Sequence, residues 1–194
     1  MGESAPLSAI QEFVLEMLRD REDVAVFGAQ AVNAYVDEPR MSQDVDILTV
    51  HAEQLAEEIR SALNKAFQIA TRVRSVPSGL GFRVYQVRKP KNRHLVDVRH
   101  VAELPPCQRV ERILVPTAPE LISQKVISMV SRPNTAKGMT DVADLRRLLI
   151  AFPDLKTQNG PVKQSLLAKS VSEQTLHAWH EVVQQEIELD DDEY

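Results

Sequence analysis

Three aspartates in two short stretches have the type and spacing of a metal-binding site. Asp44 and Asp46 are two residues apart in a β-prone run, so in a strand both carboxylates lie on one face. Asp97 stands in a second apolar run, residues 94–101. Carboxylates gathered where the surroundings become apolar repel one another unless a cation lies between them. Because hard oxygen ligands select Mg²⁺ or Mn²⁺, we expect Asp44, Asp46 and Asp97 to hold metal ions.

A strand, a glycine turn and a short helix precede the acidic pair. The apolar run 24–27 predicts a strand that stops at Gly28, where the missing Cβ lets the backbone turn sharply and approach a ligand. Residues 29–35 then suit a helix, and Pro39 ends it because its φ is fixed and it lacks an N–H donor. The chain is expected to return as a strand over residues 44–50, with the acidic pair at its start.

These elements resemble the nucleotidyltransferase fold of the DNA polymerase beta-like superfamily. The resemblance lies in Phe27-Gly28-Ala29, in Asp44-Val45-Asp46 and in Asp97 on a later strand. The segments Gly28-Ala29-Gln30-Ala31 and Arg40-x-Ser42-x-Asp44-x-Asp46 look most like the bacterial AbiEii-type group, which includes toxins of toxin–antitoxin pairs. That group commonly has Gly-Gly and then Arg-x-Thr-x-Asp-x-Asp. Here Ala29 replaces the second small Gly or Ser, which removes a hydroxyl that some relatives direct at a nucleotide phosphate, and Ser42 replaces Thr.

The resemblance implies a Mg²⁺-dependent enzyme that moves a nucleoside monophosphate from an NTP to an acceptor hydroxyl. Two ions about 3.5–4 Å apart would activate that hydroxyl and neutralise the departing pyrophosphate. Asp44 and Asp46 would hold both ions, and Asp97 would help to remove the proton of the attacking oxygen. The remaining residues expected to contact the nucleotide are Gly28, Ala29, Gln30, Arg40, Ser42 and Lys125.

The acceptor and the partners are less defined than the reaction. The resemblance offers the end of tRNA or another RNA as the acceptor, with a protein side chain or a small antibiotic-like molecule as alternatives. A cognate antitoxin protein is an expected partner if the chain is a toxin. The competing hypothesis is a degenerate, non-catalytic nucleotidyltransferase that binds nucleic acid or a partner protein, and Ala29 is the feature that favours it.

Composition indicates an ordinary globular protein, and the order of the predicted elements together with the resemblance implies the mixed α/β (α+β) class. The chain has 194 residues, 43% of them hydrophobic. We expect a nucleotidyltransferase core with a mixed β-sheet flanked by helices over residues 1–115. A helical C-terminal part is expected to pack on that core over residues 116–194, with an acidic tail at 186–194. No apolar run is long enough to span a membrane and no secretion signal is apparent, so we expect a cytoplasmic protein. The single Cys107 excludes an internal disulfide and argues against structural zinc.

The net charge of −5 conceals a basic segment between residues 72 and 112. Its basic residues are Arg72, Arg74, Arg83, Arg88, Lys89, Lys91, Arg93, Arg99, Arg109 and Arg112, against only Asp97, Glu103 and Glu111. Two explanations remain open. The charges either keep strand edges solvated and prevent aggregation, or bind a polyanion next to the acidic site.

Periodicity predicts further elements on both sides of the acidic pair. Helices are expected over residues 6–19, 51–67, 120–130, 140–150 and 171–189, and strands over 69–76, 80–88, 94–101 and 113–115. Residues 77–79 should form the turn of a hairpin. Residues 105–106 are expected to be a loop, and residues 156–161 a linker.

Lys125 stands within the apolar stripe of the predicted helix 120–130. Either its stem packs while the ammonium reaches water, or it contacts a phosphate, an alternative that the resemblance favours because relatives often carry a lysine in this helix. Further along, Lys137-x-x-x-Asp141-x-x-Asp144-Leu145 resembles a segment of the same toxin group. Asp141 either faces the amides of the first helical turn or belongs to a structural or substrate-orienting element.

Overall fold

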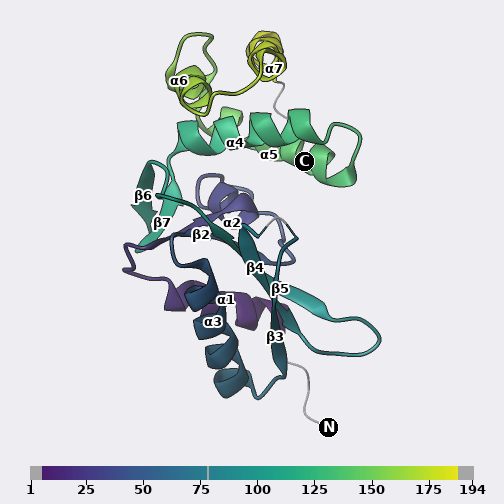
Figure 1. Cartoon of the computed structure of the whole chain (residues 1–194). Helices are drawn as coiled ribbons and strands as arrows, with labels where there is room; N and C mark the ends of the chain where they lie inside the picture. The colour runs from purple at the N-terminus through teal and green to yellow at the C-terminus, as the bar shows by residue number, and fades with distance from the viewer. Residues whose placement is uncertain (1–5, 78, 188–194) are drawn as a thin grey trace, which may run out of the picture. The chain divides into compact units, whose positions relative to one another are not determined.

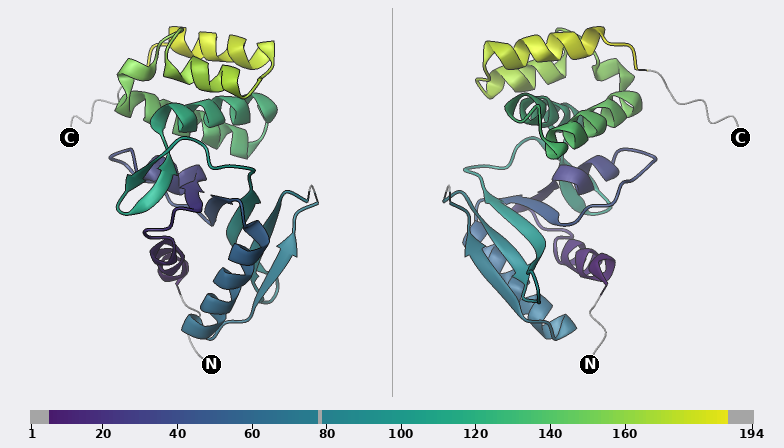
Figure 2. Two further views of the ribbon diagram at one scale, coloured as in Figure 1. Left: turned by 60° about the vertical axis from the view of Figure 1, so that its left-hand side comes forward. Right: turned by 90° about the vertical axis from the view of Figure 1, so that its right-hand side faces the viewer.

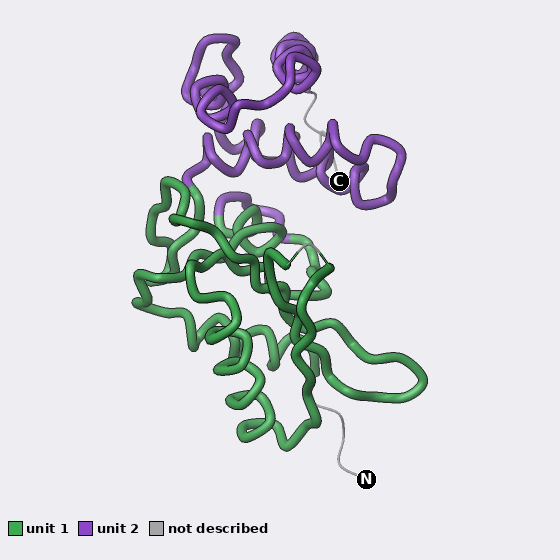
Figure 3. The backbone as a smooth tube through the Cα atoms, viewed as in Figure 1, with its two compact units in different colours: residues 1–34, 40–116 green, residues 35–39, 117–194 purple. Residues whose placement is uncertain are grey.

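The computed structural model describes residues 6–77 and 79–187. The chain folds into two compact units, shown in different colours in Figure 3. Unit 1 comprises residues 1–34 and 40–116, and unit 2 comprises residues 35–39 and 117–194. The short segment 35–39, between the glycine turn and the acidic pair, therefore belongs to the same unit as the C-terminal helices.

Unit 1 is built on a five-stranded mixed sheet with the strand order β1-β2-β5-β4-β3 (Figure 1). The strands are β1 (Val24–Phe27), β2 (Val45–Thr49), β3 (Thr71–Ser75), β4 (Gly81–Gln86) and β5 (Arg93–His100). β2 and β5 are parallel, and the other neighbours are antiparallel. The helix α3 (Ala52–Phe67) lies in the crossover between β2 and the β3–β4 hairpin. The mixed sheet flanked by helices that the sequence predicts is confirmed.

Two helices cover one face of this sheet, and they can be followed in Figure 2. α1 (Leu7–Met17) contacts β2 and β5, and α3 contacts β2, β3, β4 and β5. The rings of Phe13 and Phe67 meet edge to face, 5.4 Å between centroids, which places the two helices side by side. The core between helices and sheet is fully buried and includes Ile10, Val14, Val45, Ile47, Leu55, Ile59, Leu63, Val84, Val96 and Val98.

The opposite face of the sheet is the one that carries Asp46 and Asp97, and we call it the aspartate face. Side chains alternate along a strand, so β2 and β5 send their valines and isoleucine into the core and their aspartates to this other face. The glycine turn is also the start of α2 (Gly28–Asn33), a helix of six residues that follows β1 without a loop. The chain then continues to the acidic pair.

A second, two-stranded sheet ends unit 1. β6 (Cys107–Val110) pairs in antiparallel fashion with β7 (Ile113–Pro116). Only the second strand was predicted, since the four residues of β6 bury no side chain fully and give no periodic signal. Glu111 and Arg112 form the turn with positive φ angles of 47° and 73°.

Unit 2 is helical. α4 (Ala118–Ser131) contacts α5 (Ala136–Ala151), α6 (Pro161–Ala168) and α7 (Glu173–Gln184), and the short 3₁₀ turn η1 (Pro153–Leu155) follows α5. The linker predicted over residues 156–161 is correct only up to Gly160, because Pro161 opens α6 at the first helical position, where no N–H is needed. α7 ends at Gln184 rather than at the predicted residue 189. Of the predicted acidic tail, residues 188–194 lie outside the described residues.

No helix within residues 6–77 and 79–187 is long and apolar enough to cross a membrane.

Candidate active site

Asp46 and Asp97 are direct neighbours across the parallel strands β2 and β5. Register partners share a face of the sheet, so both carboxylates project from the aspartate face. The same row continues through all five strands, and its members in strand order are Phe27, Asp46, Asp97, Arg83 and Arg74. Two of the three predicted metal ligands are thus brought together, with two arginines on one side of them.

Gly28 lies directly against the Asp46 carboxylate. Its φ of +66° is one that side-chain-bearing residues rarely adopt, and a Cβ built on it would stand 2.9 Å from Asp46 Cγ and overlap the carboxylate oxygen. A glycine is therefore needed here for two reasons, the turn itself and the room for Asp46.

We expect Gly28→Ala to displace the Asp46 carboxylate and to lower nucleotidyl transfer at least about 10²-fold, since misplacement by about 1 Å costs that much. Gly79→Ala is the matched control, because Gly79 also has a positive φ of +70° but has no atom within 4 Å of the added Cβ. Both variants carry the backbone strain of about 1 kcal/mol, which thermal melting measures. Equal activity of the two variants would contradict the contact with Asp46.

Asp44 stands one residue before β2, not within the strand as predicted. The Ser42 hydroxyl donates to its carbonyl oxygen at 2.8 Å, and Gln11 Nε2 donates to the carbonyl of Ser42 at 2.9 Å. The Asp44 carboxylate meets His94, whose Nδ1 lies 2.8 Å from Oδ2. Ser42, predicted to contact nucleotide, thus shapes the backbone that leads into the acidic pair.

Asp97 is buried, and two guanidinium groups face it. Arg83 Nε lies 3.5 Å and Arg99 Nη2 lies 4.0 Å from Asp97 Oδ2. A hydrogen bond with the Tyr85 side chain and the charge of Asp97 raise the pKa of Arg83, although burial opposes this shift. Arg99 also stacks on the ring of Phe27, with its Cζ 4.7 Å from the centroid. Both arginines belong to the basic segment between residues 72 and 112, where their spacing in the sequence does not mark them as part of the site.

Ala29, Gln30 and Arg40, the other residues of unit 1 predicted to contact the nucleotide, lie in α2 and in the segment that follows it. Ala29 is buried, and the carbonyl of Gln30 accepts from the Ala34 amide at 3.1 Å. Arg40 is held through its backbone, since its amide donates to Asn33 Oδ1 at 3.0 Å and its carbonyl accepts from Asn33 Nδ2 at 2.8 Å. The roles of these residues toward a nucleotide stay predictions.

Lys125 lies in unit 2, in a buried network of charges. Its Nζ donates to Asp141 Oδ1 at 3.1 Å and to Asp144 Oδ2 at 2.7 Å. Arg132 also donates to Asp141, from Nε at 2.8 Å, and Arg147 approaches Asp144 at 3.8 Å. The Lys125 side chain is only 9% exposed, so its ammonium does not reach water as one interpretation held. A phosphate contact by this lysine stays a prediction.

The Asp141 carboxylate does not face the first helical turn. α5 begins at Ala136, four residues before the predicted start, and the Thr135 side chain caps it by accepting from the Gly138 amide. The start of α5 could not be predicted from apolar periodicity, because residues 132–138 have no large apolar side chains and a helix cap and first turn need none. Asp141 and Asp144 instead share one side of α5 and hold Lys125 of α4.

The donor set of unit 1 suits a hard divalent cation. Asp46 and Asp97 offer adjacent carboxylate oxygens, which Mg²⁺ and Mn²⁺ prefer. Asp44 is turned to His94, and within residues 6–77 and 79–187 no group of three or more His, Cys, Asp or Glu side chains is already arranged around one point. We conclude that the residues fit a metal site whose third carboxylate has another partner.

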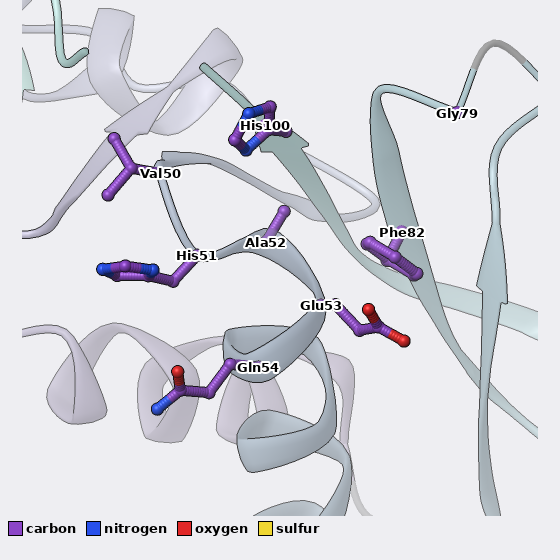
Figure 4. A pocket seen from close by; sticks show the side chains of 8 residues that line it. All are labelled: Val50, His51, Ala52, Glu53, Gln54, Gly79, Phe82 and His100. Atoms are coloured by element: carbon purple, nitrogen blue, oxygen red, sulfur yellow. The ribbon is translucent and has the colours of Figure 1, made fainter. Parts of the chain in front are cut away.

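A shallow pocket lies beyond the opposite end of β2 from the acidic pair (Figure 4). It is lined by residues 50–54, which connect β2 to α3 and form the first turn of this helix, together with Gly79, Phe82 and His100. None of the three aspartates lines it, so it is separate from the site described above.

Comparison with known sequences identifies the family. The sequence model of the family described as nucleotidyl transferase AbiEii toxin, type IV toxin–antitoxin system, matches residues 17–192. The chain belongs to this family. As an AbiEii nucleotidyltransferase it is an enzyme, and the family expected from Gly28, Arg40 and the acidic pair is confirmed. A comparison with curated proteins found no match.

Solved structures show the same fold. The Megavirus polyadenylate synthase is similar with a TM-score of 0.58 and 13% identity, over 79% of this chain and 33% of that one. JHP933 from Helicobacter pylori has a TM-score of 0.55 and 13% identity, over 91% and 88%. The antibiotic-resistance factor ANT(2″)-Ia has a TM-score of 0.54 and 14% identity, over 90% and 95%. The AbiEii chain thus spans a third of the length of the polyadenylate synthase.

Proposed function

We propose that this AbiEii protein is a Mg²⁺-dependent nucleotidyltransferase that transfers a nucleoside monophosphate from an NTP to an RNA hydroxyl, and that it acts as the toxin of a toxin–antitoxin pair. The observation that carries the proposal is the pairing of Asp46 with Asp97 beside Gly28 on a nucleotidyltransferase sheet. Family membership supports the reaction class and the pairing with an antitoxin.

Within unit 1, each residue has a separate task. Asp46 and Asp97 would hold Mg²⁺ with Asp44, and the ion would stabilise the charge that develops on the triphosphate. The Asp97 carboxylate would also accept the proton of the attacking hydroxyl. Arg83 and Arg99 flank Asp97 and offer N–H donors to phosphate oxygens. Gly28 keeps the backbone of the turn close to the nucleotide.

The charge on the aspartate face favours a polyanionic acceptor. One similar structure is a polyadenylate synthase and another an antibiotic-resistance factor, so the fold alone does not select the acceptor. On this chain, the row through Asp46 and Asp97 ends in Arg83 and then Arg74 on the edge strand β3. Arg74 lies over the ring of Tyr85, with its Cζ 5.9 Å from the centroid, so the guanidinium stays near the two strands that carry this end of the row.

Incubation of the purified chain with each labelled NTP, Mg²⁺ and total RNA tests the proposal. We expect label on an RNA species, with tRNA as the first candidate, and no transfer when Mg²⁺ is chelated. Label on a protein or small molecule, with none on RNA, would overturn the choice of acceptor while leaving the reaction class intact.

We expect Arg72→Glu combined with Arg74→Glu to weaken RNA binding and to leave binding of Mn²⁺ and NTP unchanged. Both side chains are exposed on the aspartate face at the sheet edge. The slope of log affinity against log salt should fall by about 0.7 to 0.9 for each lost phosphate contact. Lys65→Glu, at an exposed position on α3, reverses one charge on the other side of the sheet and should have no such effect. If the double arginine variant and Lys65→Glu bind RNA equally well, the proposal that this sheet edge binds the RNA acceptor is contradicted.

A further inference from the structure

His94 is joined to the predicted metal ligand Asp44 by the 2.8 Å contact between Nδ1 and Oδ2. Asp44 lies just outside β2, so the strand pairing that fixes Asp46 does not extend to it. The two side chains are 27% and 26% exposed, so the contact is partly shielded from water and stronger than an exposed pair. Asp44 has no register partner on β5, and the contact with His94 can set the plane of this carboxylate.

The His94 ring is itself held in place. Its Nε2 lies 3.1 Å from the carbonyl oxygen of Val96. Tyr85, its cross-strand partner, packs against the ring at 5.1 Å between centroids and 33° between planes. The register shifts between Val84 and Tyr85, and this irregularity brings Tyr85 opposite His94. A ring fixed by a backbone contact and an aromatic neighbour can fix the carboxylate that it contacts.

We propose that His94 is a positioning residue that orients the Asp44 carboxylate for the divalent cation. The inference rests on the proposed function, because it takes Asp44 to be a metal ligand. Carboxylates that bind metals are commonly held by outer hydrogen-bond partners, and loss of such a partner typically costs about 10- to 100-fold in metal affinity. His94 has no direct contact with the reacting groups in this role.

Two amide substitutions of the full chain separate positioning from packing. Asn places its side-chain N–H close to the position of Nδ1, where it can donate to Asp44, whereas Gln places it close to Nε2. We expect His94→Gln to weaken Mn²⁺ binding about 10- to 100-fold in the presence of NTP, and His94→Asn to stay within about threefold of wild type. Electron paramagnetic resonance of free Mn²⁺ gives the affinity, and metal-free melting reports any loss of fold. His100→Gln, on the opposite face of β5, is the control.

If His94→Gln binds Mn²⁺ with wild-type affinity, the role of His94 is overturned while the proposed function stands. Equal weakening by Asn and Gln would also overturn it, because the position of the donor would then not matter. If His94→Gln does not fold, His94→Asn decides, and a tenfold loss in that variant counts against the inference. A wild-type chain that binds no Mn²⁺ with NTP would overturn the proposed function and this inference with it.

Discussion

Asp46→Asn is expected to lower nucleotidyl transfer by about 10³-fold or more. The substitution keeps the size of the side chain but removes a charge that would hold Mg²⁺, and a metal ion contributes several kcal/mol to a charged transition state, where about 1.4 kcal/mol corresponds to tenfold. The metal-free melting temperature should hold or rise, because Asp46 lies beside Asp97 and their repulsion is relieved. Transfer of labelled NTP to RNA and thermal melting with and without Mg²⁺ and NTP measure both effects.

Asp97→Asn should lower nucleotidyl transfer as much as Asp46→Asn does, but the two variants should differ in metal-free stability. Asp97 faces Arg83 and Arg99, so its neutralisation leaves two guanidinium groups without their carboxylate. Both arginine side chains are nearly half exposed, which limits the expected loss to about 1 kcal/mol or less. A variant of either aspartate that melts well below wild type yet keeps its stabilisation by Mg²⁺ and NTP would show a structural cluster in place of a metal site.

Lys125→Met is expected to destabilise unit 2 by about 3 kcal/mol or more. The substitution leaves the buried carboxylates of Asp141 and Asp144 without the ammonium that bridges them, and removing one partner of a buried ion pair costs about 3–5 kcal/mol. Arg132 and Arg147 still approach the two carboxylates, which places the expected value at the lower end. Denaturant unfolding measures it.

Lys137→Met is the matched control for this prediction. Lys137 is exposed near the start of α5, and a surface substitution of this kind stays within about 0.5 kcal/mol. If Lys125→Met is as stable as Lys137→Met but loses nucleotide binding, the lysine serves the nucleotide rather than the helix pair, as the resemblance to relatives suggested.

The parts of the site that depend on local pattern were predictable from the sequence. Alternation places Asp46 on one face of its strand, a glycine after an apolar run marks the turn, and an isolated acid in a valine-rich strand marks Asp97, whereas Asp44 lies outside the strand in which alternation placed it. Sequence could not show that Asp46 and Asp97 share a register pair, because the offset of parallel strands is set by packing and not by either strand alone.

The pairing of His94 with Asp44 was missed for a related reason. The five histidines are scattered along the sequence, and fifty residues separate His94 from its partner. Their meeting requires both the parallel pairing of β2 with β5 and the register shift at Tyr85.

In unit 2, the unusual position of Lys125 was apparent from periodicity, but its partners on α5 depend on how two helices pack. The eight-residue α6 buries only Val162 and Leu166, too few to form a periodic signal.

The assignment of residues 35–39 to unit 2 has a consequence for synthesis on the ribosome. Tyr35 packs edge to face against Phe152, with 5.5 Å between ring centroids, although 152 − 35 = 117 residues separate them. At synthesis rates of roughly 5–20 residues per second, Phe152 follows Tyr35 by about 6–23 s. A nascent chain that stalls in this interval after residue 97 carries all three aspartates but lacks the ring on which the segment before the acidic pair rests.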